Sequence, residues 1–267
     1  MINLNTESNL SLLQQVQNKQ ESILEKLASG KKINSAADGA AAQQIIDRLT
    51  TQVEGNRQAI SNAYDGVSLT QVAEGGLSGI SQDVSRIREL SVQSGNGLLT
   101  DADRQAIQSE VTQLQENISQ TIEQTEFAGK PLLSAEGSVD FQIGANAGQK
   151  LAVGTQDVAA GLNDILNVDL SSAQGAEDAL AAADSAAEFV SSARTDLGAT
   201  QNQFESAARN LTQADVNVSA ARSRIQDTDF AQATSENAAA GILSQTSLAV
   251  QGIANQQQGQ VLTLLNG

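Results

Sequence analysis

Hydrophobic positions recur at steps of three and four residues over two long stretches of the chain, from Ile46 to Ile87 and from Leu180 to Ile225. This spacing places one largely apolar stripe along each of two long α-helices, as it does in coiled coils. The pattern gives no sign of a pocket enclosed between the stripes. Because apolar stripes are normally buried against other helices, the pattern indicates assembly rather than chemistry.

Shorter patterns complete the order of elements. Ser29-Gly30 ends the first helical pattern, and Thr100 with Asp103 resembles a capping box at the start of a later one. Alternating apolar residues predict a single β-hairpin near 139–153. The helices are expected at 4–28, from about 40 to the loop at 94–97, from 100 to before 127, at about 175–225 and at 231–264.

This order is nearly mirror-symmetric, with a short helix, a linker and a long helix at each end. We therefore expect a mainly α protein, an elongated coiled-coil-like helical rod that carries one small β-hairpin. The N- and C-terminal helices are expected to pair as an antiparallel two-helix coil.

Composition narrows the chemistry. The chain has no His, Cys or Trp, and aromatic residues make up 2% of it. Cofactor pockets and nucleic-acid stacking surfaces usually recruit aromatic side chains. The calcium-loop-like start at Asp101 has Thr112 where a Glu is required. We therefore predict no enzyme, no cofactor and no metal site.

Charge is unevenly distributed along the chain. The formal net charge of −16 argues against binding to nucleic acid. Residues 1–43 carry four acidic and four basic side chains, and residues 226–267 carry three acidic ones and no basic one. Nearly all of the negative charge therefore lies in the middle, which favours a solvated middle and ends that can pack together.

Targeting signals are not evident in the sequence. The stretch at 1–15 has no basic region and no continuous apolar run, so we expect no cleaved signal peptide. No run approaches the roughly 20 apolar residues that span a bilayer, so we expect no membrane insertion.

Seven strings spread along the chain carry a family resemblance. They are LASGKKINSAADGAAAQQI (27–45), NAYDGVSLTQVAEGGL (62–77), RIRELSVQS (86–94), QTEFAGKPLL (124–133), LGATQNQF (197–204), AARSRIQDTDFA (220–231) and QGIANQQQGQVLTLL (251–265). In this order of elements, they resemble those of bacterial flagellins, the subunits of the flagellar filament. Gly39, Ala42 and Gln226 stand where the family usually has Asp, Gly and Glu.

The resemblance implies a structural protein that polymerises into a helical filament for swimming motility. Residues 1–43 and 227–267 would form the two halves of an inner domain, and residues 44–226 would form a rod domain with the hairpin. The middle is too short for large outer domains, so a thin, smooth filament is expected. Assembly would bury the apolar seams of the terminal helices, namely Leu10, Leu13, Leu24, Leu27, Ile242, Leu248, Ile253 and Leu264.

One string has a further implication. RIRELSVQS resembles the segment that vertebrate Toll-like innate receptors bind in recognised flagellins, although Ser85 stands where those members often have Gln. The same residues could instead serve axial packing between subunits. This set comprises Arg86, Arg88, Glu89, Leu90 and Glu110.

The resemblance also implies partners and a location. The partners would be further copies of the chain, the filament cap, the hook-junction proteins and an export chaperone that holds the C-terminal helix. The protein would be secreted and extracellular. A hook–filament junction protein and a secreted coiled-coil adhesin remain the alternatives.

Overall fold

A computed structural model describes residues 2–265, with side chains described at 10–257 and 260. The fold is mainly α with long helices, as the sequence predicts, and it carries two small two-stranded sheets. The elements are α1 (Ile2–Ser29), α2 (Ala36–Ser94), α3 (Asp101–Gln124), β1 (Glu126–Phe127), β2 (Lys130–Pro131), β3 (Ser134–Gln142), β4 (Lys150–Asp157), α4 (Val158–Gly161), α5 (Asn163–Leu166), α6 (Ala173–Gln226) and α7 (Phe230–Leu265).

The chain forms two compact units. The terminal unit comprises residues up to 53 and from 216 onward, and the central unit comprises residues 54–215. These limits differ from the predicted domain limits at 43/44 and 226/227. Helices α2 and α6 contribute to both units.

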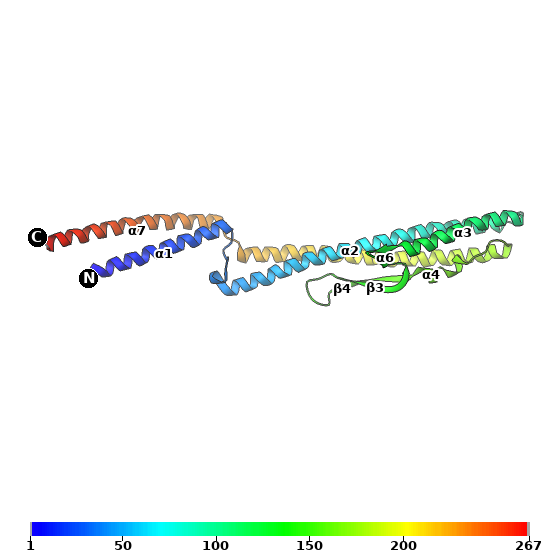
Figure 1. The fold of residues 1–267 in the computed structure, drawn as a ribbon, viewed down its shortest axis with the longest axis horizontal. Helices are drawn as coiled ribbons and strands as arrows, with labels where there is room; N and C mark the ends of the chain where they lie inside the picture. Colours follow the sequence, from blue (N-terminus) through cyan, green and yellow to red (C-terminus); the bar gives the residue numbers. More distant parts are fainter. Residues whose placement is uncertain (1, 266–267) are drawn as a thin grey trace. The chain divides into compact units, whose positions relative to one another are not determined.

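In the terminal unit, α1 and α7 lie side by side (Figure 1). The end of α1 meets the start of α7, because Gly30 O accepts a hydrogen bond from Thr228 N at 3.0 Å. Lys31 and Asp227 form an antiparallel bridge beside this contact. The two helices are therefore antiparallel, as predicted. Gly30, with a φ of +69°, ends α1 in the left-handed conformation that glycine adopts without steric cost.

The central unit is built on the part of α2 from 54 to 94, which extends for roughly 60 Å at 1.5 Å per residue. The predicted stripe on this helix is buried, since Leu77, Ile80, Val84 and Ile87 are core residues. Helices α3 and α6 also supply core residues, including Val111, Ile118, Ala183, Val190 and Phe204.

The predicted hairpin is present and longer than expected. Strands β3 and β4 pair antiparallel, with Val139 opposite Val153 and Phe141 opposite Leu151. The ring of Phe141 meets that of Phe204 on α6 edge to face, with the centroids 5.4 Å apart. This contact ties the hairpin to the helices. The two-residue pair β1–β2 was not predicted from the sequence.

Among the described residues, no helix is both long and apolar enough to cross a membrane.

Candidate functional site

The contact between α1 and α7 is made mainly by small and polar residues of α7. On α1, Val16 and Ile23 are buried, and Leu13, Gln20 and Leu27 are half-buried. On α7, buried and half-buried positions recur at alternating steps of four and three, which is the spacing of a coiled-coil seam. The positions with this spacing are Ala233, Asn237, Ala240, Ser244, Ser247, Gln251 and Ala254, and Gly241 beside them is also half-buried.

The bulky apolar side chains of α7 point away from this contact. Ile242 is 67% exposed and Ile253 is 58% exposed. They lie three turns apart and therefore share one face of the helix. Leu243, Leu248 and Val250 are also exposed, as are Leu10, Leu12 and Leu24 on α1. Soluble monomers rarely expose so many large apolar residues on one helix pair, so this surface is a candidate interaction site.

The predicted seam residues thus divide into two groups. Leu13 and Leu27 lie half-buried in the α1–α7 contact. Leu10, Leu24, Ile242, Leu248 and Ile253 are exposed. The side chain of Leu264 lies outside the described residues. Sequence reasoning missed the small residues that make the contact, although the seven-residue step from Ala233 to Ala240 signals them.

The pairing of α1 with α7 is energetically weak. Burying Val16 and Ile23 contributes on the order of 1.5–3 kcal/mol each. Ordering each backbone residue costs roughly 1–2 kcal/mol before hydrogen bonds and burial offset it. Two buried alanines add little to the favourable side. Among the described side chains, the α1–α7 contact by itself therefore supplies only a small net stabilisation.

Aspartates organise both linkers of the terminal unit. Asp38 Oδ2 accepts hydrogen bonds from Ser35 N at 2.9 Å and Asn34 N at 3.0 Å. These backbone donors, Ser35 first, hold the pKa of Asp38 below its usual value. Asp229 Oδ1 accepts from Ala231 N and Gln232 N at the start of α7. Asp229 thus caps the start of α7, whereas Asp38, in the first turn of α2, holds the backbone of the linker that precedes the helix.

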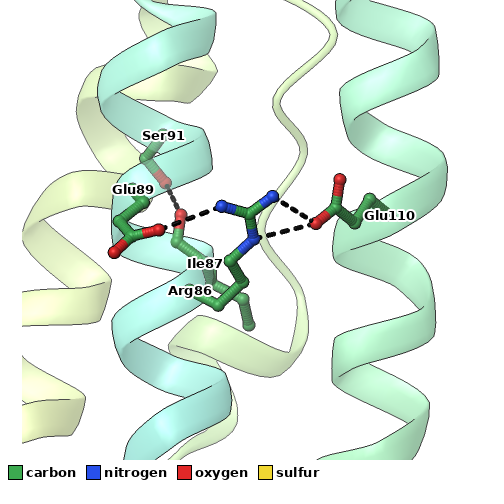
Figure 2. Close-up of polar contacts among 5 residues, drawn as sticks. All are labelled: Arg86, Ile87, Glu89, Ser91 and Glu110. Atoms are coloured by element: carbon green, nitrogen blue, oxygen red, sulfur yellow. Dashed lines mark hydrogen bonds and ion pairs between the residues drawn. The ribbon is translucent and has the colours of Figure 1, made fainter.

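The second predicted set lies on the central unit around Arg86 (Figure 2). Arg86 of α2 donates to Glu110 Oε1 of α3 from Nε at 2.9 Å and from Nη2 at 2.7 Å. Its Nη1 donates to Glu89 Oε2 at 3.0 Å. The hydrogen bonds to Glu110 and then to Glu89 raise the pKa of Arg86. The structure therefore brings Arg86, Glu89 and Glu110 together.

The other two members of this set lie elsewhere. Arg88 Nε donates to Asp184 Oδ1 of α6 at 2.6 Å, and both side chains are largely exposed. Leu90 is only 2% exposed and belongs to the hydrophobic core. Leu90 therefore offers almost no surface to a partner in the free chain, and its predicted role in recognition or packing stays a prediction.

Comparison with known families gives two matches. The model of the bacterial flagellin N-terminal helical region matches residues 2–138, and that of the bacterial flagellin C-terminal helical region matches residues 180–265. Flagellin of Bacillus subtilis (strain 168) is 38% identical over 277 residues, covering 91% of this chain and 91% of the relative. The flagellar filament 30.7 kDa core protein of Treponema maltophilum is 38% identical over 259 residues, again covering 91% of each.

Solved structures share the fold. The crystal structure of Bacillus cereus flagellin aligns with a TM-score of 0.53 at 23% identity, covering 61% of this chain and 94% of that one. A Vibrio parahaemolyticus protein described as flagellar hook-associated aligns with a TM-score of 0.61 at 16% identity, covering 71% of this chain and 100% of that one. At such low identity these likenesses show the fold alone.

Proposed function

Because this chain belongs to the bacterial flagellin family, whose members are structural subunits of the flagellar filament, we propose that assembly buries the exposed apolar side chains of α1 and α7 between subunits. The filament is an extracellular appendage of motility. Self-polymerisation follows from the family, and the proposal concerns which residues drive it.

The observation that carries the proposal is the arrangement of side chains on α7. Small and polar residues contact α1, and the bulky ones face outward. Covering Ile242 and Ile253 with neighbouring subunits would contribute on the order of 1.5–3 kcal/mol per side chain. From the same arrangement we expect α1 and α7 to pair weakly in the free chain and to become well ordered in the filament.

The layers of the filament are part of the proposal. Residues 1–43 and 227–267 form the inner domain, and residues 44–226 form the next shell. The nearly neutral ends and the acidic middle support this order, since charge is better tolerated on the solvated outside. The few residues between α3 and α6 favour a thin filament without large outer domains.

The same exposed face accounts for the proposed transient partners. A chaperone in the producing cell would hold α7 and keep Ile242, Leu243 and Val250 from aggregating. The chain would be exported without a cleaved signal peptide and would meet the filament cap and the hook-junction proteins only outside the cell. Weak α1–α7 pairing supports this path, because such helices are readily opened.

Axial packing and binding to a Toll-like receptor are the two roles proposed for Arg86, Arg88, Glu89 and Glu110. These side chains are substantially exposed, and each one forms an ion pair within the chain. Any partner must therefore replace those pairs with its own. A receptor reporter that stays silent with the full-length monomer at high concentration would eliminate the receptor role.

An aspartate in the exposed face tests the assembly proposal. We expect Ile253→Asp to block seeded polymerisation, because a buried unpaired carboxylate is costly. The central unit should keep its helical circular-dichroism signal. Ile253→Val, which stays apolar, and Gln245→Glu, which adds charge at an exposed polar position of α7, should both polymerise. Filaments of normal length and yield from Ile253→Asp would disprove the proposal.

A further inference from the structure

The loop between α2 and α3 is held by a buried arginine that sequence reasoning did not identify. Arg104 is buried, and its guanidinium donates to three backbone carbonyl oxygens at 3.0 Å each. Nε donates to Ser94 O, Nη1 to Leu99 O and Nη2 to Asn96 O. This clamp fixes the loop at 95–100 in one conformation.

The clamped loop contains an asparagine followed by glycine, Asn96-Gly97, and both residues are exposed. Asn96 Oδ1 accepts a hydrogen bond from Leu98 N at 3.1 Å. Within the described residues, the amide of Gly97 donates no hydrogen bond. A Cβ added at Gly97 would meet nothing within 4 Å. The backbone nitrogen that follows Asn96 is thus unhindered and uncommitted.

Asparagine is a thermolabile residue, because the next backbone nitrogen can attack its side-chain amide carbon. In this reaction Gly97 N loses its proton and bonds to Cγ of Asn96. The bond from Cγ to Nδ2 then breaks, and Nδ2 leaves as ammonia after taking up a proton from water. The product is a five-membered succinimide. Water then opens the ring at either carbonyl to give aspartate or isoaspartate.

The loop supplies hydrogen-bond donors at both places where negative charge develops. Deprotonation of Gly97 N places charge on the carbonyl oxygen of Asn96, which receives the donor and the positive charge of Arg104. Attack at Cγ places charge on Oδ1, which already receives Leu98 N–H. Fixed donors aimed at developing charge accelerate a reaction, as an oxyanion hole does.

We propose that Asn96-Gly97 is a self-modifying site, at which the Arg104 clamp promotes deamidation of Asn96 rather than protecting against it. The modification adds a negative charge next to Leu98, which is 91% exposed at the loop surface. The isoaspartate product also lengthens the main chain by one carbon. Arg104 then cannot keep all three carbonyl contacts, so older protein carries a looser α2–α3 connection.

The test compares rates in the full-length chain and in a synthetic peptide. The purified chain is aged at neutral pH, and the tryptic fragment 89–104, bounded by Arg88 and Arg104, is followed by mass spectrometry. The peptide of residues 89–104, aged in parallel, gives the rate without the clamp. We expect faster deamidation in the folded chain, with a rate that rises with pH. A folded-chain rate equal to or below that of the peptide would overturn the proposal.

Variants at Arg104 and Leu98 separate promotion by the clamp from simple loop mobility, and a third, at Gly97, tests the reaction itself. Arg104→Lys keeps the charge but loses the planar set of donors, and it should slow deamidation in the folded chain while leaving the peptide rate unchanged. Faster deamidation of Asn96 in the folded Arg104→Lys chain would show that the clamp protects the loop, and would overturn the proposal. If Arg104→Lys fails to fold by circular dichroism, Leu98→Pro removes the donor to Oδ1 at an exposed position. Because proline also restricts Gly97, the same substitution is made in the peptide, and the folded chain should lose more of its rate than the peptide does. Gly97→Ala, which the open space permits, should slow it in both chain and peptide.

Discussion

Gly66 on α2 packs against the ring of Phe204 on α6, and Gly66→Ala should destabilise the central unit. A Cβ at position 66 would lie 2.5 Å from two ring carbons of Phe204. The ring is completely buried and is held on another side by Phe141. It therefore cannot rotate away without disturbing the hairpin.

Two opposing terms set the magnitude. Overpacking a well-packed core typically costs about 1–3 kcal/mol. Replacing glycine by alanine inside a helix returns about 1 kcal/mol. The expected net effect of Gly66→Ala is a loss of up to about 2 kcal/mol, and each kcal/mol lowers Tm by about 2–4 °C in a chain of this size.

Gly75→Ala on the same helix is the matched control, because an added Cβ there meets nothing within 4 Å. It should raise Tm slightly through helix propensity alone. Thermal unfolding of the unpolymerised chain, followed by circular dichroism, measures both variants. If Gly66→Ala were as stabilising as Gly75→Ala, the close packing of α2 on Phe204 would be disproved.

Three further predictions concern capping and surface charge. Thr100→Ala should cost about 1 kcal/mol, because it removes one half of the capping box of α3, whereas Thr112→Ala on the same helix should cost less in the same unfolding assay. Because the pKa of Asp38 is lowered in the folded chain, its carboxylate stabilises the fold above its unfolded pKa of about 3.9, and this stabilisation is lost as the pH falls below that value. In Asp38→Asn, the helical circular-dichroism signal should therefore fall less steeply on acidification. Arg86→Met should leave Tm nearly unchanged, since exposed ion pairs such as Arg86–Glu110 contribute little, and a drop larger than that of Gly66→Ala would contradict this reasoning.

The stripe on α2 could be predicted because its buried positions carry Ile, Val and Leu between polar neighbours. The stripe on α6 was predicted less well. Steps of three and four along α6 can run through Ala187 and Arg194 as well as through Ala186 and Ala193. The structure buries the second pair, together with Ala183, Val190 and Phe204. Alanine is abundant on every face of α6, so its hydrophobic pattern does not fix the rotation of the helix.

The terminal helices show a different limit of sequence reasoning. Large apolar residues such as Ile242 and Ile253 were expected to form seams, but the sequence does not say which seam faces α1 and which faces another molecule. The structure places small residues in the internal contact. The clamp by Arg104 could not be predicted either, because its partners are backbone carbonyl oxygens. Every residue has such an oxygen, so only the folded geometry shows which ones the guanidinium binds.

The central claim is that the terminal helices drive filament assembly, and seeded polymerisation tests it most directly. Purified full-length chain and a chain lacking residues 227–267 are each added to filament fragments and viewed by negative-stain electron microscopy. Long, thin filaments from the full-length chain alone are the predicted result. Filaments of equal length from both chains would contradict the claim, because assembly would then proceed without the exposed face of α7.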